Sequence, residues 1–221
     1  MTSEKIHVYF VPGMAAGAEI FRNIRLPEDR FTIHILQWLI PEKNESITTY
    51  SERMATLITE KESVLIGVSF GGVVAQEMSE FLSLRKLIII SSVKTKDELP
   101  RRMKFARKSF FYKLIPTSLV LSAEDLTKFS VGPRSEKRLR LYQDYLHVRD
   151  KQYLDWAIQN MVCWNRKTPV AHVTHIHGDS DIVFPLKHIK DCEVLEGGTH
   201  IMILTKGLQL SEMIVAIIEK N

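Results

Sequence analysis

Short apolar runs alternate with longer amphipathic stretches along most of the chain. Six runs have the length and composition of strands: KIHVYFV (5–11), RFTIHILQW (30–38), SVLIGVS (63–69), KLIIISS (86–92), AHVTHIHG (171–178) and CEVLEG (192–197). Outside them, the pattern of apolar positions predicts helices at 46–60, 70–82, 185–189 and 205–220, and residues 12–24 are expected to form a glycine-containing turn that leads into a helix. This alternation indicates a parallel sheet with helices on both faces.

The alternation stops in the segment from about 93 to 165. This segment has helical patterns at 101–115, 122–130 and 135–162 and no clear strand. It is rich in aromatic residues, which predict a small core of its own with a few rings left to line a substrate pocket. We expect one domain, 1–221, built as an open six-stranded α/β fold, in which about 93–165 forms a helical cap over the carboxyl edge of the sheet.

Composition excludes several classes of protein. The 221 residues are 45% hydrophobic, enough for a packed core, and no run approaches the roughly 18 apolar residues of a membrane-spanning helix. The apolar run near the N-terminus is too short and too polar for a signal peptide. Cys163 and Cys192 lack the spacing of a disulfide framework or a zinc site, so a reducing, cytoplasmic setting is expected.

The stretch GVSFGG, residues 67–72, surrounds Ser69 with glycine where a predicted strand meets a predicted helix. A reversal within two residues forces this serine into sparsely populated backbone space, and Cβ atoms at Gly67 and Gly71 would collide with their surroundings. The hydroxyl then stands at the positive end of a helix, where the Phe70 N–H can stabilise charge on a bound carbonyl oxygen. These features indicate a nucleophile.

A nucleophilic serine needs a base and a group that orients the base. Asp181, in HGDSDIVFP, and His200, in GGTH, each follow a predicted strand, so we expect both at the same sheet edge as Ser69. Asp179 is a rival acid in the same loop, interpreted here as a turn-forming residue. The chain order Ser, Asp, His is that of α/β-hydrolases.

On these motifs the sequence resembles the α/β-hydrolase superfamily over nearly its whole length. The acid of that family commonly lies in a segment like H-G-x-x-D-x-x-x-P, and here the matching residues are His177, Gly178, Asp181 and Pro185. Its histidine commonly lies in Gly-x-x-His, matched by GGTH. The resemblance implies acyl transfer to water, with the serine as nucleophile, the histidine as base and the aspartate as orienting acid. It implies neither a metal nor an organic cofactor.

Two parts of the chain depart from the family pattern. The oxyanion loop usually reads His-Gly-x, whereas this chain has Pro12-Gly13-Met14. The resemblance implies the Met14 N–H as the second oxyanion donor, beside the Phe70 N–H. The family also usually opens with an antiparallel hairpin, and the short stretch before the first predicted strand leaves no room for one. A compact, all-parallel sheet is therefore expected.

Histidines in predicted strands raise the question of a metal. His172, His175 and His177 lie in one strand, but three metal ligands there would conflict with its packing role, so no metal site is expected. His7 and His34 are expected to be hydrogen-bonded residues of the core or the sheet edge.

Charge is unevenly distributed. The net charge is +4, and eight basic residues lie between Lys94 and Lys113 with only two acids. Three interpretations stay open: a solvated face, a docking surface for an anionic leaving group such as the phosphates of coenzyme A or an acyl-carrier protein, and loose attachment to anionic lipid. No nucleic-acid-binding motif accompanies the cluster, so nucleic acid is not an expected partner.

The resulting expectation is a serine hydrolase that cleaves a carboxylic ester or thioester of a small acyl substrate. Three alternatives stay open: a thioesterase specific for acyl-CoA or acyl-carrier substrates, a lyase or perhydrolase on the same fold, and a catalytically inert binding protein.

Overall fold

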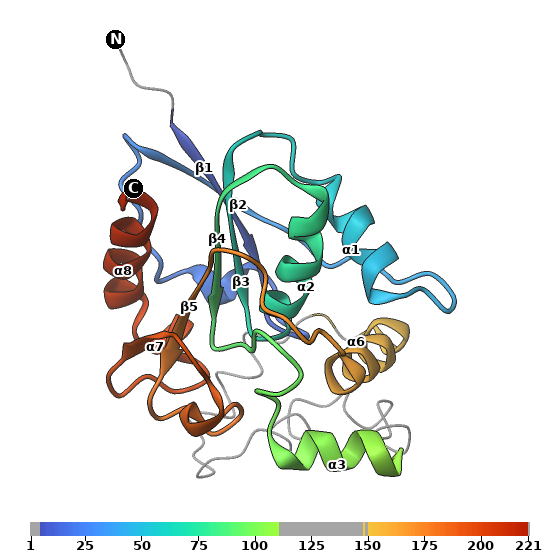
Figure 1. The fold of residues 1–221 in the computed structure, drawn as a ribbon. Helices are drawn as coiled ribbons and strands as arrows, with labels where there is room; N and C mark the ends of the chain where they lie inside the picture. Colours follow the sequence, from blue (N-terminus) through green and yellow to red (C-terminus); the bar gives the residue numbers. More distant parts are fainter. Residues whose placement is uncertain (1–4, 111–147, 149, 221) are drawn as a thin grey trace.

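A single parallel sheet organises the part of the protein that the computed structural model describes, residues 5–110, 148 and 150–220. Its strands are β1 (Ile6–Val11), β2 (Phe31–Ile35), β3 (Ser63–Val68), β4 (Leu84–Ile90), β5 (Val173–Gly178) and β6 (Glu193–Leu195). They lie in the order β2-β1-β3-β4-β5-β6, and every neighbouring pair is parallel (Figure 1). The expected six-stranded parallel sheet is confirmed.

The strand order fixes where a ligand can bind. The chain runs outward from β1 to β2 and then crosses to β3 on the other side of β1. The connections after β1 and β3 therefore leave the sheet in opposite directions, and open α/β sheets place their ligand sites at the carboxyl ends of such strands. Val11 pairs with Gly67, so the two strands end side by side at this edge of the sheet.

Two hydrophobic cores cover the two faces of the sheet. Within β3, Leu65 belongs to the first core, while Val64 and Ile66 belong to the second. The first face carries α1 (Ile47–Ala55), α2 (Phe70–Met78) and α6 (Lys151–Cys163); the second carries the 3₁₀ turn η1 (Ala18–Phe21), α7 (Met202–Thr205) and α8 (Gly207–Glu219). Figure 1 shows α8 on the side of the sheet opposite α1 and α2.

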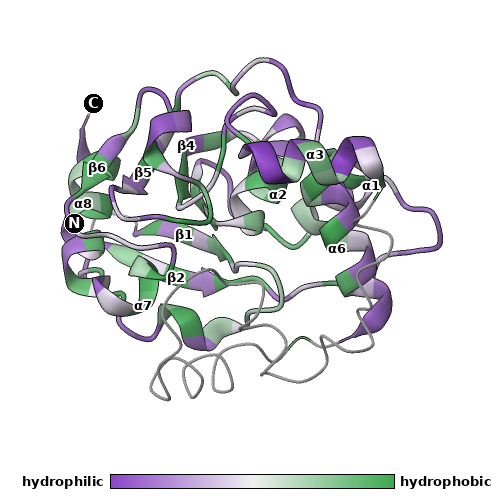
Figure 2. Cartoon of the chain, turned by 90° about the horizontal axis from the view of Figure 1, so that it is seen from below, coloured by the Kyte–Doolittle hydropathy of each residue, from purple (hydrophilic) through white to green (hydrophobic). Residues whose placement is uncertain are grey.

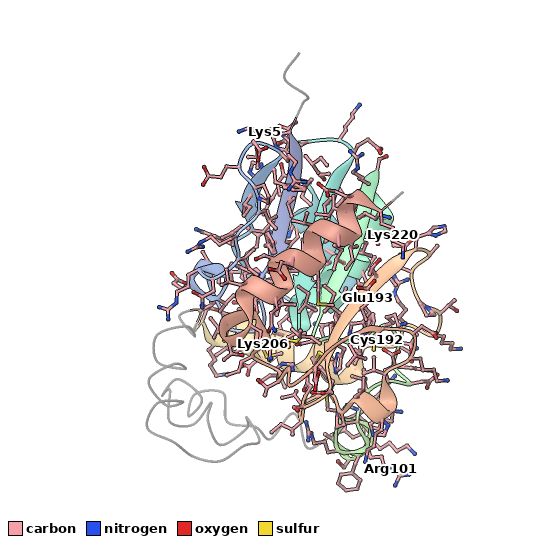
Figure 3. The ribbon with its side chains drawn as sticks, turned by 90° about the vertical axis from the view of Figure 1, so that its left-hand side faces the viewer. Lys5, Arg101, Cys192, Glu193, Lys206 and Lys220 are labelled. Carbon is pink, nitrogen blue, oxygen red and sulfur yellow. The ribbon has the colours of Figure 1, made fainter. Side chains whose placement is uncertain are left out.

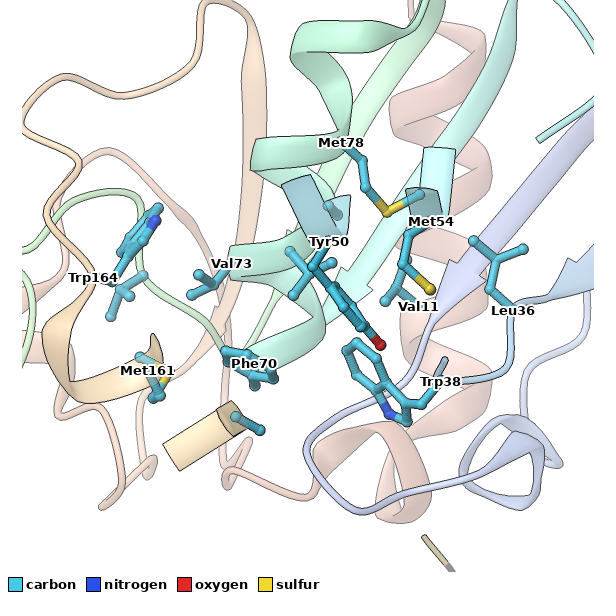
Figure 4. Close-up of a cluster of buried hydrophobic side chains, with 14 of the residues drawn as sticks. Val11, Leu36, Trp38, Tyr50, Met54, Phe70, Val73, Met78, Met161 and Trp164 are labelled. Atoms are coloured by element: carbon cyan, nitrogen blue, oxygen red, sulfur yellow. The ribbon is translucent and has the colours of Figure 1, made fainter. Parts of the chain in front are cut away.

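Aromatic side chains dominate the first core. Trp38, Tyr50 and Phe70 lie close together in this core (Figure 4). The centroid of the Trp38 ring lies 5.8 Å from that of Phe70, and the Tyr50 ring lies 4.1 Å from the ring of Trp156 in α6. Tyr153 of α6 is fully buried in the same cluster. The expectation that aromatic residues of segment 93–165 form a separate core is therefore wrong for α6. Its periodicity correctly indicated a buried face, but that face packs on the main sheet layer.

In 12–24 the expected turn is present, but the helix expected after it is wrong, because Ala18–Phe21 forms only a single 3₁₀ turn. Ala15 has a positive φ of 62°, and the Ala16 N–H donates to Gly13 O in a tight turn. Gly17, at the N-cap, supplies no side chain to cap the segment. By contrast, α1 has a side-chain N-cap, since Ser46 Oγ accepts from the Thr49 N–H at 3.1 Å.

In the described residues, the segment from about 93 to 165 contains two helices. They are α3 (Arg101–Ser109) and α6, and both lie near the carboxyl ends of the strands (Figure 1). α3 is mostly purple in Figure 2, as its five cationic residues imply. The helix predicted at 122–130 lies outside the described residues.

The remaining short elements are the 3₁₀ turns η2 (Ser79–Phe81) and η4 (Leu186–His188). Each helix in the described ranges is too short or too polar to cross a bilayer.

Candidate active site

Ser69 occupies the turn between β3 and α2. It is the N-cap of α2, with φ 54° and ψ −121°, a backbone conformation that costs a non-glycine residue about 1–3 kcal/mol. Two hydrogen bonds hold the turn: the Ser69 N–H donates to Ile90 O at 2.9 Å, and Ser92 Oγ donates to Ser69 O at 2.7 Å. The strained residue is thus fixed from β4 and from the residues that follow β4.

The flanking glycines allow the chain to pass through this turn. A Cβ atom at Gly67 would lie 2.3 Å from Gly71 O, and one at Gly71 would lie 2.1 Å from Pro12 O. Both obstacles are main-chain atoms that cannot rotate away. The glycines predicted from sequence to relieve collisions therefore do so in the structure.

The three side chains predicted as a triad form one chain of hydrogen bonds. Ser69 Oγ lies 2.9 Å from His200 Nε2, and His200 Nδ1 lies 2.9 Å from Asp181 Oδ2. Since a carboxylate can only accept, Nδ1 carries the hydrogen, and Nε2 is left to accept from the serine hydroxyl. This arrangement suits proton transfer from the hydroxyl to the imidazole.

Asp181 is held more completely than the other two residues. Its side chain is fully buried, and its Oδ1 accepts the N–H groups of Val183 (2.8 Å) and Phe184 (2.9 Å). Burial acts to raise the pKa of Asp181, but the charge and hydrogen bond of His200 and the Phe184 amide outweigh burial, so the pKa lies below its usual value. Asp181 is therefore a carboxylate at neutral pH.

The loops of Asp181 and His200 are joined directly. The Ser180 N–H donates to Gly198 O at 2.9 Å, and a Cβ atom at Gly178 would lie 2.1 Å from that same oxygen. The backbones after β5 and β6 therefore touch, which brings the acid next to the base.

The loop after β1 lies against Ser69. A Cβ atom at Gly13 would lie 3.6 Å from Ser69 Cβ. Gly13 O accepts hydrogen bonds from Trp38 Nε1 and from the Ala16 N–H, both at 3.1 Å. That carbonyl shares a peptide plane with the Met14 N–H, which points the opposite way. Trp38 therefore fixes the direction of the N–H group predicted as an oxyanion donor.

Phe70 supplies the other predicted donor. It is the first residue of α2, so its N–H has no acceptor within the helix and lies at the positive end of the helix dipole. Its buried ring stacks on Trp38. One side chain, Trp38, thus contacts both Phe70 and the Gly13–Met14 peptide.

Comparison with known proteins gives similarity of structure without similarity of sequence. No protein-family model matches the chain, and no curated protein matches it in sequence. Among solved structures, an esterase from Exiguobacterium antarcticum superimposes with a TM-score of 0.72 at 16% identity, over 100% of this chain and 94% of that one. The chain has the α/β-hydrolase fold.

Two further structures with the α/β-hydrolase fold are similar over most of their length. A lipase-esterase related protein from Clostridium acetobutylicum gives a TM-score of 0.66 at 14% identity, covering 98% of this chain and 96% of that one. A bromoperoxidase from Bacillus anthracis gives 0.64 at 16% identity, covering 98% and 93%. Proteins named for different reactions thus share this fold.

Other candidates from the sequence lie apart from this site. Asp179 is exposed and accepts from Ser180 Oγ, whereas His200 pairs with Asp181. His7 Nδ1 and His34 Nε2 lie 2.8 Å apart in a hydrogen bond between β1 and β2, as expected for edge residues. Within residues 5–110 and 150–220, no group of three or more His, Cys, Asp or Glu side chains could hold a metal ion.

Sequence reasoning missed three residues that support the site in this α/β-hydrolase fold. Ser92 bonds the carbonyl of Ser69, Trp38 orients the loop after β1, and the Phe184 ring packs edge-on against His200 at 5.4 Å. A buried aromatic ring or a serine after a strand carries no signal in the sequence that distinguishes support of a site from ordinary packing.

Proposed function

We propose that this protein is a serine hydrolase that cleaves a carboxylic ester or thioester through an acyl-enzyme on Ser69. The observation that carries the proposal is the continuous hydrogen-bond chain from Ser69 Oγ through His200 to the buried carboxylate of Asp181. The fold shared with an esterase and a lipase-esterase related protein supports it.

The proposed reaction has two stages. Ser69 Oγ attacks the carbonyl carbon while its proton passes to His200 Nε2, and the Met14 and Phe70 N–H groups stabilise the negative oxygen. His200 returns the proton to the departing alcohol or thiol, which leaves an acyl group on Ser69. Water, deprotonated by His200, then releases the acid. Asp181 keeps the imidazole in the required tautomer throughout.

The first test is Ser69→Ala with a panel of acyl esters and a fluorophosphonate probe. Loss of the nucleophile should lower kcat by about 10⁵–10⁶-fold and abolish labelling, because the base and the acid act only through it. The thermal midpoint should stay close to that of the wild type. Turnover that survives in Ser69→Ala would contradict the proposal. Labelling of the wild type without turnover of any ester would favour an inert binder, or a perhydrolase that uses another acceptor.

A cationic surface favours one substrate class as a second candidate. Arg102 Nη2 donates to Val183 O at 2.6 Å, which fixes α3 beside the loop that follows Asp181. Burial, and next the positive charges of Lys187, Lys104 and Arg101, lower the pKa of His188, so these basic groups from α3 and η4 lie close together. Such a surface fits a leaving group that carries phosphate, such as coenzyme A or an acyl-carrier arm.

The matched test compares Arg101→Gln/Lys187→Gln with Lys5→Gln/Lys220→Gln. Figure 3 shows Lys5 and Lys220 toward the end of the molecule opposite Arg101. If phosphate binds at α3 and η4, the first variant should raise KM for acyl-CoA about fivefold, since each exposed pair contributes at most about 1 kcal/mol, and added salt should reduce the difference. KM for a p-nitrophenyl ester of the same acyl group should not change. Equal effects of both double variants would remove this candidate.

A further inference from the structure

Two buried histidines of β5 lie directly behind the Asp181–His200 pair. His175 and His177 are two residues apart on a strand, so they share one face, and both are essentially inaccessible to solvent. His177 Nδ1 lies 3.1 Å from His175 Nε2, and His177 Nε2 lies 2.8 Å from Phe184 O. Burial acts first to lower the pKa of each, so both imidazoles are neutral.

The acceptors in this group fix the direction of each hydrogen bond. Phe184 O can only accept, so His177 must carry its hydrogen on Nε2. Its Nδ1 is then a lone pair, and the hydrogen between the two rings must come from His175 Nε2. His175 Nδ1 is consequently a lone pair as well. Among the described residues His175 Nδ1 has no hydrogen-bond partner. This agrees with the assignment, in which His175 Nδ1 is an acceptor at the end of the hydrogen-bond chain.

Phe184 connects this chain to the candidate triad in two ways. Its carbonyl accepts from His177, while its N–H donates to Asp181 Oδ1 at 2.9 Å. Its ring packs edge-on against the His200 ring. His177 Nε2 also lies 3.7 Å from Asp181 Oδ2, the oxygen that accepts from His200. A movement of His177 would therefore reach the acid and the base together.

We propose that His177, itself oriented by His175, is a positioning residue that acts through Phe184 to hold Asp181 and His200 in their reactive arrangement. This inference rests on the proposed function of the triad. It assigns no proton transfer and no metal to the histidine pair. The pair is a fixed, one-way chain of hydrogen bonds, from His175 to His177 to the Phe184 carbonyl.

The first experiment measures the histidine tautomers in the wild-type protein. In protein labelled with ¹⁵N-histidine, the ring nitrogens of His175 and His177 should report neutral Nε2–H tautomers that persist across the accessible pH range. Assignments come from His175→Gln and His177→Gln. An Nδ1–H tautomer or a charged ring at either position would overturn the proposed direction of the chain.

The second experiment compares His177→Leu with His177→Gln. Leucine removes the donor to Phe184 O, whereas the glutamine amide can replace it at similar reach. Since small misplacements of reacting groups are costly, His177→Leu should lower kcat about tenfold to a hundredfold with KM within about twofold, and His177→Gln should recover most of the loss. The deshielded Nδ1–H resonance of His200 should weaken or shift in His177→Leu and return in His177→Gln.

Ile176→Ala is the matched control for a general loss of packing. Ile176 is fully buried on the same strand but belongs to the core on the opposite face. Its substitution should lower the thermal midpoint and leave kcat and the His200 resonance unchanged. If kcat falls equally in His177→Leu and Ile176→Ala, the positioning role is refuted. Activity that persists in Ser69→Ala would refute the proposed function instead, while the tautomer measurement would still judge the histidine chain.

Discussion

The turn at Ser69 and the loop at Asp181 hold their candidate catalytic side chains by different physical means. Around Ser69 the backbone is strained, and close approach of main-chain atoms at Gly67 and Gly71 defines its path. Around Asp181 the carboxylate accepts two backbone N–H groups and one imidazole N–H in a buried loop. Steric constraint defines the first region, and hydrogen bonding defines the second.

This difference determines what each region tolerates. A steric constraint fails when any atom is added, because the obstructing atoms are backbone. A hydrogen-bonded loop fails when an acceptor or a charge is lost, even if the shape is preserved. Substitutions that change only volume should therefore damage the turn, and substitutions that change only charge should damage the loop.

Asp181→Asn is expected to have the largest effect of the substitutions that separate the two regions. The asparagine amide preserves the shape of the aspartate, but its NH₂ group can donate to His200 Nδ1. It therefore favours the tautomer of His200 that carries the hydrogen on Nε2, which cannot accept the serine proton. We expect kcat to fall by about 10⁴-fold, as for acid-to-amide changes in such triads, with a nearly unchanged KM. Steady-state kinetics on the best ester substrate measures this. A loss below tenfold would mean that the loop positions His200 without the charge.

The pH dependence of stability gives a check on the same variant. Because the folded pKa of Asp181 lies below its unfolded value, the carboxylate adds stability that is fully present above about pH 4 and is lost as the pH falls through the folded pKa. The difference in unfolding free energy between the wild type and Asp181→Asn should be largest near neutral pH and shrink in acid. Denaturant titrations at several pH values would detect this, and a constant difference would contradict it.

Gly71→Ala is the next test and addresses the turn alone. Its Cβ atom would meet Pro12 O at 2.1 Å, so the backbone must move, and we expect a loss of about 1–3 kcal/mol in the free energy of unfolding. Gly13→Ala is the matched control, because its nearest contacts lie at 3.6 and 3.7 Å, ordinary van der Waals distances. Chemical denaturation compares the two. Equal stability of both variants would show that the turn is not sterically constrained.

Ser92→Ala should have the smallest effect. It removes the hydrogen bond to Ser69 O and should cost about 1 kcal/mol of unfolding free energy. The adjacent Ser91→Ala is a close control, since Ser91 Oγ is buried without a hydrogen-bond partner among the described residues. Its loss should cost less than that of Ser92. The reverse ranking in thermal denaturation would show that the hydrogen bond does not support the turn.

The same contrast explains what the sequence could and could not predict. Glycine at 67 and 71 shows in the sequence that the turn is sterically constrained. The partners of Ser69 could be predicted because Asp181 and His200 each lie in a loop after a recognisable strand. The hydrogen bonds that hold the Asp181 loop could not be predicted in this way. The N–H groups of Val183 and Phe184 that donate to Asp181 belong to the backbone and are present whatever the side chains are. The role of Trp38 depends on Gly13, 25 residues away, which no local pattern indicates.

Errors in the predicted fold have equally local causes. In 12–24 the sequence predicts a glycine-containing turn and then a helix. The turn occupies Gly13–Ala16, with a positive φ at Ala15, and the segment after it, Ala18–Phe21, is a single 3₁₀ turn. In α6 the periodicity showed that one face is buried and could not show that its partner is the sheet layer around Trp38. Helix propensity and hydrophobic periodicity describe one secondary-structure element at a time, whereas packing depends on which pairs of elements come into contact.

The hydrogen bond between Ser180 and Gly198 has a consequence for thermal motion. Because this hydrogen bond links the two loops, we expect the Asp181 carboxylate and the His200 imidazole to move together relative to the sheet. Fluctuations at this edge would then alter the gap between hydroxyl and imidazole far more than the gap between imidazole and carboxylate. Such motion would interrupt proton transfer from the Ser69 hydroxyl to His200, while Asp181 would stay hydrogen-bonded to the imidazole.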